Sequence, residues 1–150
     1  MKVHPQQIPP EGVHLEGHDP SSILDLRDEG VQPLTEVGYS LDVGLSEGGV
    51  FATGALSVDV QFQCVTCLEL FEHPIRVEDF ACQVEHDGGD TVDLTEPMRE
   101  DILLALPAHP HCDWSGERVC RGVPADVSPL TESDSPVREV WGALDQLKLK

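Results

Sequence analysis

The sequence is poor in aromatic and in basic residues. Its 150 residues include two Trp, one Tyr and four Phe, so Val, Leu and Ile must supply most of a hydrophobic core. Nine Lys and Arg stand against 28 Asp and Glu, which gives a formal net charge of -19. Such a surface repels phosphate and attracts cationic partners, so broad nucleic-acid binding is disfavoured and basic proteins are favoured. Solubility alone is the simpler explanation of the charge.

Long apolar runs are also missing. The longest, residues 102–106, is far too short to span a bilayer, and the first residues do not read as a signal peptide. We therefore expect a cytoplasmic protein with no membrane partner. The sequence shows no phosphate-binding Gly-rich loop and no recognisable catalytic constellation, so we expect no small-molecule substrate. The length predicts one domain, residues 1–150. In a reducing cytosol, five cysteines argue against a disulfide framework and leave metal binding or packing.

Period-two alternation is the clearest pattern in the sequence. It covers residues 39–45 and residues 50–62, with turn residues between them, and predicts two antiparallel strands. A third strand is expected soon after Cys67. Its apolar residues change parity, which a bulge near residues 78–79 reconciles. Residues 1 to about 20 are expected to form an irregular arm with one short extended piece, residues 12–16.

A helix is predicted after Thr95. Thr95 is expected as its N-cap, and Pro107 is expected to end it. Met98, Ile102 and Ala105 share one stripe, which we expect to pack against the sheet.

A second helix is predicted near the C-terminus, from about Ser135. Its apolar stripe consists of Val137, Val140, Trp141, Leu144 and Leu147. Residues 107 to about 134 are rich in Pro, Gly and Ser and are expected to form a long loop. The predicted fold class is therefore α+β: a mainly antiparallel sheet, one helix after Thr95, and a C-terminal helix.

Two cysteines have the spacing of a zinc knuckle. Cys64 and Cys67 are separated by two residues on an expected turn, where both thiolates can face one ion. A structural zinc site needs two more ligands, and Cys112 and Cys120 are the natural candidates. Seven residues lie between them, which is too many for a typical second knuckle.

Other interpretations of the cysteines stay open. His109 or His111 could replace one of the later cysteines as a ligand. Thiol redox chemistry is the weaker alternative, because a redox motif places its first Cys at a helix N-terminus, whereas Cys64 ends a predicted strand. Cys82, in the middle of a strand, is expected to be ordinary packing.

Several segments occur in an informative order. A strand reads VFATGALSVDVQFQ and leads into CVTCLELF, and a later segment reads DLTEPMREDILLALP before the last cysteines and the closing ALDQLKLK. This order resembles the YceD (DUF177) family, the large ribosomal RNA subunit accumulation proteins, over residues 12–150. The two ordered motifs are specific in combination, although neither would be specific alone.

The resemblance implies a non-enzymatic protein that is needed for accumulation of large-subunit rRNA. In bacteria the family is associated with a small basic protein of the large ribosomal subunit. The positions that match family motifs are Cys64, Cys67, Leu68, Arg99, Glu100, Pro107, Cys112 and Cys120. Thr66 departs from the family, which usually has arginine before the second cysteine, and this counts against direct RNA contact at the knuckle. Many members have a compact second cysteine pair, so the wide spacing of Cys112 and Cys120 counts against zinc.

Two mechanisms are compatible with this resemblance. The protein could shield a small basic ribosomal protein, or it could bind large-subunit rRNA as a zinc-knuckle assembly factor. The net charge and Thr66 favour the first mechanism. The arginines after the knuckle would form an RNA-facing patch only if the fold brings them together; they are Arg76, Arg99, Arg118, Arg121 and Arg138.

Overall fold

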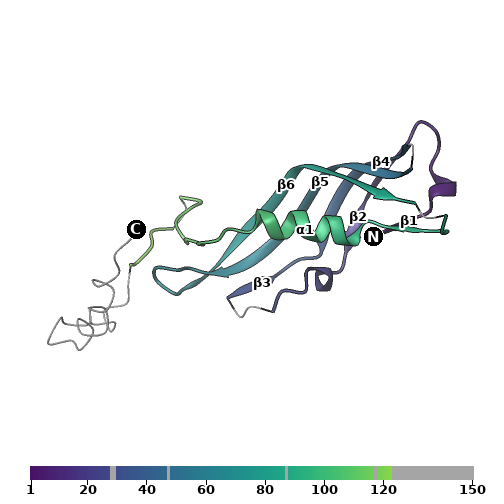
Figure 1. Ribbon diagram of the computed structural model, residues 1–150. Helices are drawn as coiled ribbons and strands as arrows, with labels where there is room; N and C mark the ends of the chain where they lie inside the picture. The colour runs from purple at the N-terminus through teal and green to yellow at the C-terminus, as the bar shows by residue number, and fades with distance from the viewer. Residues whose placement is uncertain (28–29, 47, 87, 117, 123–150) are drawn as a thin grey trace, which may run out of the picture.

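The computed structural model describes residues 1–27, 30–46, 48–86, 88–116 and 118–122. One helix, α1 (Thr95–Ala105), lies along a curved antiparallel sheet (Figure 1). The sheet consists of β2 (Val13–Asp19), β3 (Val31–Pro33), β4 (Val37–Ser46), β5 (Gly49–Gln63) and β6 (Leu70–Glu85). Two shorter strands, β1 (Lys2–Val3) and β7 (Val92–Asp93), pair separately. The predicted α+β class is confirmed, and the expected C-terminal helix lies outside the described residues.

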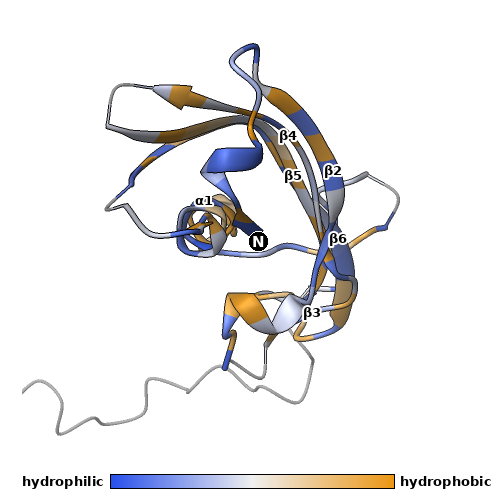
Figure 2. Cartoon of the chain, turned by 90° about the vertical axis from the view of Figure 1, so that its right-hand side faces the viewer, coloured by the Kyte–Doolittle hydropathy of each residue, from blue (hydrophilic) through white to orange (hydrophobic). Residues whose placement is uncertain are grey.

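β5 is the centre of the sheet. β6 pairs with β5 along its length on one side. On the other side β4 pairs with the first part of β5 and β3 with the last part, while β2 pairs with β4. The alternating apolar residues of β5 are buried; they are Val50, Ala52, Leu56, Val58, Val60 and Phe62. Viewed end-on, the sheet curves around α1, so this face forms the core (Figure 2).

β6 carries a bulge where the sequence predicts one. The register between β5 and β6 shifts by one residue, and the extra residue falls at Glu78–Asp79 of β6. As a result Ile75 and Phe80, which differ in parity, are both buried. The bulge therefore keeps the apolar side of β6 on the core along the whole strand.

The N-terminal region is more regular than predicted. Residues 13–19 form β2 and pair throughout with β4, whereas the sequence predicts only a short extended piece in an irregular arm. The backbone of β4 supplies these partners, so β2 depends on a neighbour rather than on its own weak pattern. Two 3-10 turns, η1 (Pro5–Gln7) and η2 (Ser21–Leu24), complete this region.

The start of α1 differs in detail from the prediction. Leu94, not Thr95, occupies the N-cap position. The N–H of Thr95 donates a hydrogen bond to the Asp93 carboxylate at 2.9 Å. This hydrogen bonding to Thr95 lowers the pKa of Asp93. An acidic side chain thus compensates an unpaired N–H group at the beginning of the helix.

The buried face of α1 is shorter than predicted. Met98 and Ile102 are fully buried against the sheet, as expected, but Ala105 is exposed. The helix ends at Ala105, and the next residue, Leu106, is extended and packs on the core in its place. No helix in the described ranges is long and apolar enough to cross a membrane.

We expect Ile102→Ala to lower the free energy of unfolding by about 2–5 kcal/mol, because it leaves a cavity between α1 and the sheet. Leu104→Ala is the matched control on the same helix: Leu104 is 82% exposed, so its loss should change stability by less than about 0.5 kcal/mol. Urea denaturation of both variants measures the difference. Equal effects of the two substitutions would show that the orientation of α1 is wrong.

Candidate metal centre

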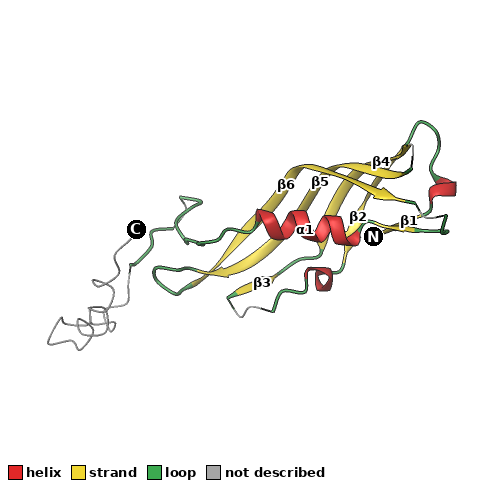
Figure 3. Cartoon of the chain, viewed as in Figure 1, coloured by secondary structure: helices red, strands yellow, loops and turns green. Residues whose placement is uncertain are grey.

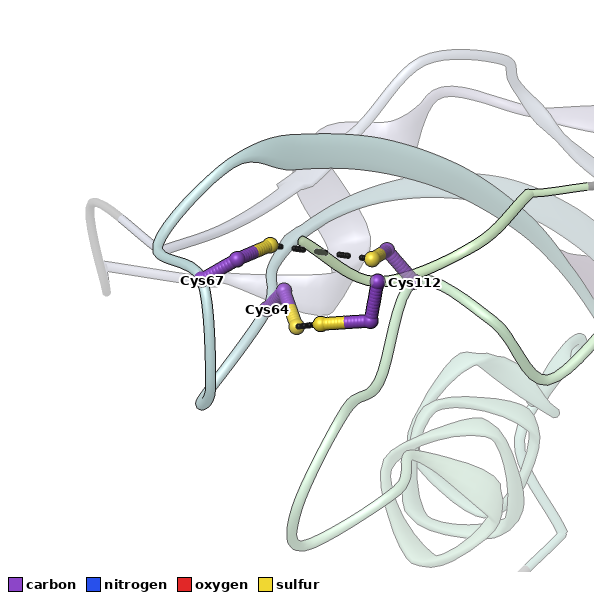
Figure 4. Close-up of side chains that lie close together, drawn as sticks. Cys64, Cys67 and Cys112 are labelled. Carbon is purple, nitrogen blue, oxygen red and sulfur yellow. Dashed lines mark hydrogen bonds between the residues drawn. The ribbon is translucent and has the colours of Figure 1, made fainter. Parts of the chain in front are cut away.

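Four cysteines from two distant segments meet at one end of the sheet. Cys64 and Cys67 lie in the turn between β5 and β6, and Cys112 and Cys120 lie in the segment after α1. Figure 3 shows this turn and this segment at the same end of the sheet, and Figure 4 shows Cys64, Cys67 and Cys112 in close-up. Their sulfur atoms are all within 4.8 Å of one another. Cys64, Cys67 and Cys112 are buried and Cys120 is half-buried. The structure therefore assembles the four ligands that the sequence predicts.

The distances between sulfur atoms fit a tetrahedral metal site. The sulfur of Cys67 lies 3.6 Å from that of Cys112, and the sulfur of Cys64 lies 3.9 Å from that of Cys120. Metal–sulfur bonds of about 2.3 Å in tetrahedral geometry place sulfur atoms about 3.8 Å apart. The four cysteines are free thiols. The cluster thus has the size and donor set of a four-cysteine site for a thiolate-binding metal.

The turn between β5 and β6 holds the first pair. The N–H of Cys64 donates to the Glu69 carbonyl at 2.9 Å, and the N–H of Leu68 donates to the Cys64 carbonyl at 3.0 Å. Leu68 has a φ of 61°, a left-handed conformation that costs a non-glycine residue about 1–2 kcal/mol. Its side chain is exposed, so burial of that side chain does not offset the cost. The turn keeps this conformation while presenting Cys64 and Cys67 on one side.

Two contacts fasten the later segment to this turn. The N–H of Val65 donates to the Pro110 carbonyl at 2.9 Å. The Thr66 hydroxyl and Nδ1 of His111 are 3.2 Å apart. Both contacts come from the two residues between Cys64 and Cys67. Thr66 therefore helps to join the turn to the segment after α1.

His109 and His111, the alternative ligands, are not part of the cluster. His109 is exposed. His111 contacts Thr66, and its ring centroid lies 6.1 Å from that of Trp114. Cys82 lies on β6, outside the cluster and only half-buried, and its burial raises the pKa of its thiol. It is less buried than a fully packed core cysteine would be.

The surroundings shift the thiol pKa values of Cys64 and Cys112 in opposite directions. Burial raises the pKa of Cys64, but backbone N–H groups of Cys67, Cys112 and Thr66 together outweigh burial and lower the pKa to about 6. Burial and hydrogen bonds from the other thiols raise the pKa of Cys112 to about 12. The protein alone therefore accommodates a thiolate at Cys64 but opposes ionisation at Cys112. Four thiolates in this volume require a cation among them.

Arg99, Glu100 and Pro107, the other positions of the resemblance, are not part of the cysteine cluster. Arg99 donates to the Leu24 carbonyl at 3.3 Å and to Glu96 at 2.8 Å, so it links α1 to η2 and has a structural role. Glu100 is exposed, and Pro107 follows the end of α1.

No protein-family model, curated protein or solved structure matches this chain.

We expect reduced, purified protein to contain close to one transition-metal ion per chain, because four thiols at these distances form a complete ligand set. Cys64→Ser should lower the metal content markedly, and Cys82→Ser should leave it unchanged, since Cys82 lies outside the cluster. Elemental analysis of the proteins measures this. Metal-free reduced protein, or equal metal loss in both variants, would contradict the assignment.

Proposed function

We propose that this protein is a cytoplasmic, non-enzymatic ribosome-biogenesis factor of the YceD family, needed for accumulation of large-subunit rRNA. It acts by shielding a small basic protein of the large subunit until that protein meets RNA. The order of the sequence motifs supports the ribosomal assignment. The observation that carries the mechanism is the charge of the sheet.

Most charged side chains on the strands of the sheet are acidic. They are Glu16, Asp19, Asp42, Asp59, Glu72, Glu78, Asp79 and Glu85. Arg76 is the one Arg or Lys in β2 to β6, and Asp59 lies 3.4 Å from its guanidinium. The field of the sheet is therefore negative nearly throughout. It attracts Lys- and Arg-rich surfaces and repels a phosphate backbone.

The sheet also has the shape to receive basic side chains. Two shallow grooves of about 360 and 530 Å³ share His18, Gly38, Ser57 and Arg76. Glu16 and Glu78 line the first groove, and Glu36 and Asp59 line the second. Gly38 and Ser57, small residues on paired strands, leave the surface of the sheet low at the centre, while carboxylates line the same grooves. Long Lys and Arg side chains can enter such grooves and keep their charged ends near the carboxylates.

We propose zinc as the ion of the metal centre. Tetrahedral sites of four sulfur atoms bind zinc or iron, and a closed, buried set of four cysteines is typical of structural zinc. The ion would hold the segment after α1 against the turn of β5 and β6. A zinc ion with four thiolates carries a net charge of about -2, which adds to the negative field.

RNA binding is the second candidate function, and one observation favours it. Arg118 and Arg121 both approach the Glu69 carboxylate, at 3.4 Å each, and Trp114, which precedes them in the same segment, is 46% exposed. Exposed aromatic rings and arginines are the usual contacts of single-stranded RNA. Arg76 and Arg99 lie on β6 and α1 and pair with other carboxylates, those of Asp59 and Glu96.

Thiol redox activity has less support. A low pKa, such as that of Cys64, suits a reactive thiol as well as a metal ligand. However, Cys64 and Cys67 are buried, and each lies close to a cysteine of the later segment. Neither is at a helix N-terminus. Burial limits access of a disulfide substrate to their sulfur atoms.

Binding titrations at several salt concentrations test the function. We expect tight binding to small basic large-subunit proteins, weakening as salt rises, and little binding to naked large-subunit RNA. The double substitution Glu16→Gln with Glu78→Gln should weaken protein binding about tenfold, while Arg118→Gln should leave it unchanged. Tight RNA binding that Arg118→Gln abolishes, without protein binding, would support the second candidate function instead.

A further inference from the structure

A groove whose described lining carries no charge lies beside the cysteine cluster and is separate from the acidic grooves of the sheet. Its volume is about 450 Å³, and it runs between β3, the end of β5 and the segment that follows α1. Leu26, Val31, Phe62, Val65, Leu106 and Pro107 are among its lining residues. None of the described residues that line it is charged, although 25% of the chain is charged. An apolar occupant is therefore favoured over a basic protein or an RNA.

The chain itself supplies such an occupant. The described part ends at Gly122, and the sequence 136–147 follows after a short connection. That sequence has apolar residues at helical spacing; they are Val137, Val140, Trp141, Leu144 and Leu147. A lone helix of this length is marginal in water and gains most of its stability by packing its apolar stripe against a surface.

The described part of the chain ends close to the groove. The sulfur of Cys120 lies 3.9 Å from that of Cys64, and Val65, the neighbour of Cys64, lines the groove. Residues 123–135 span at most about 45 Å when extended, so the segment can reach every part of the groove. A short tether also raises the local concentration of the segment to about the millimolar range.

A second copy of the chain is a weaker occupant. Two molecules that each carry a formal charge of -19 repel each other, and that repulsion acts before any apolar contact forms. Residues 136–147 belong to the same chain as the groove, so their docking requires no encounter between two acidic molecules. We propose that residues 136–147 dock as an amphipathic helix in this groove and place Trp141 against its apolar lining. This proposal does not rest on the proposed function.

The two tryptophans of the chain make a direct test feasible. In Trp114→Phe, Trp141 is the only tryptophan. We expect its fluorescence emission to be blue-shifted and at least threefold less sensitive to acrylamide quenching than in a free peptide of residues 123–150. Emission and quenching equal to those of the free peptide would overturn the proposal.

Matched substitutions locate the contact. Ala108→Asp places a charge in the groove, and Val119→Asp places the same charge at a 92% exposed site near the metal centre that does not line the groove. On the segment, Leu144→Asp lies on the apolar stripe and Gln146→Asp lies off it. In the Trp114→Phe background, Ala108→Asp and Leu144→Asp should each abolish the blue shift, and the two controls should retain it. Equal behaviour within either pair would overturn the proposal.

Two further measurements cover the other outcomes. A blue shift that disappears on dilution would assign the groove to a second copy rather than to the same chain. Hydrogen exchange on the unsubstituted protein keeps the test valid if Trp114→Phe does not fold. Amides of residues 136–147 should then exchange at least tenfold more slowly than in the free peptide, and exchange at the peptide rate would overturn the proposal.

Discussion

The described fold depends on the pairing of β5 with its neighbours. This strand pairs with β3, β4 and β6, and its alternating apolar residues form the surface on which α1 packs. It also leads directly to Cys64, the first residue of the metal centre. One strand therefore fixes the sheet, the core and the position of the first ligand. A substitution that shifted its register by one residue would turn its apolar side chains away from α1.

The four-cysteine cluster helps to position the segment that follows α1. Residues 107–122 contain no helix or strand among those described, and their side chains supply little apolar burial apart from the cysteines. Val65 and Thr66 contact this segment, Arg118 and Arg121 of the segment approach Glu69, and the sulfur cluster completes the junction. In this small protein an ion can thus supply order that the apolar core does not reach.

Local sequence patterns predicted the structural features that depend on residues close together in the chain. The alternation of residues 50–62 and the change of parity around Glu78 both appear in the structure, because side-chain period and burial are coupled in a strand. β2 was underestimated because its pairing comes from β4, which lies far along the chain. Ala105 was misplaced because helical spacing does not show where the chain turns away. Cys112 and Cys120 were predicted as ligands, but their wide spacing in the sequence could not show that their sulfur atoms approach those of Cys64 and Cys67.

The bulge in β6 has a consequence for how molecules meet in solution. Among the described strands β6 pairs only with β5, so its other edge carries unpaired backbone groups along a 16-residue strand. Such an edge invites another strand to add to it and is a common origin of aggregation. The irregular register at Glu78–Asp79, its two carboxylates, and the missing N–H of Pro74 interrupt any continuous ladder there. The same extra residue that keeps the apolar side of β6 on the core therefore also makes this edge less suited to pairing with a strand of another molecule.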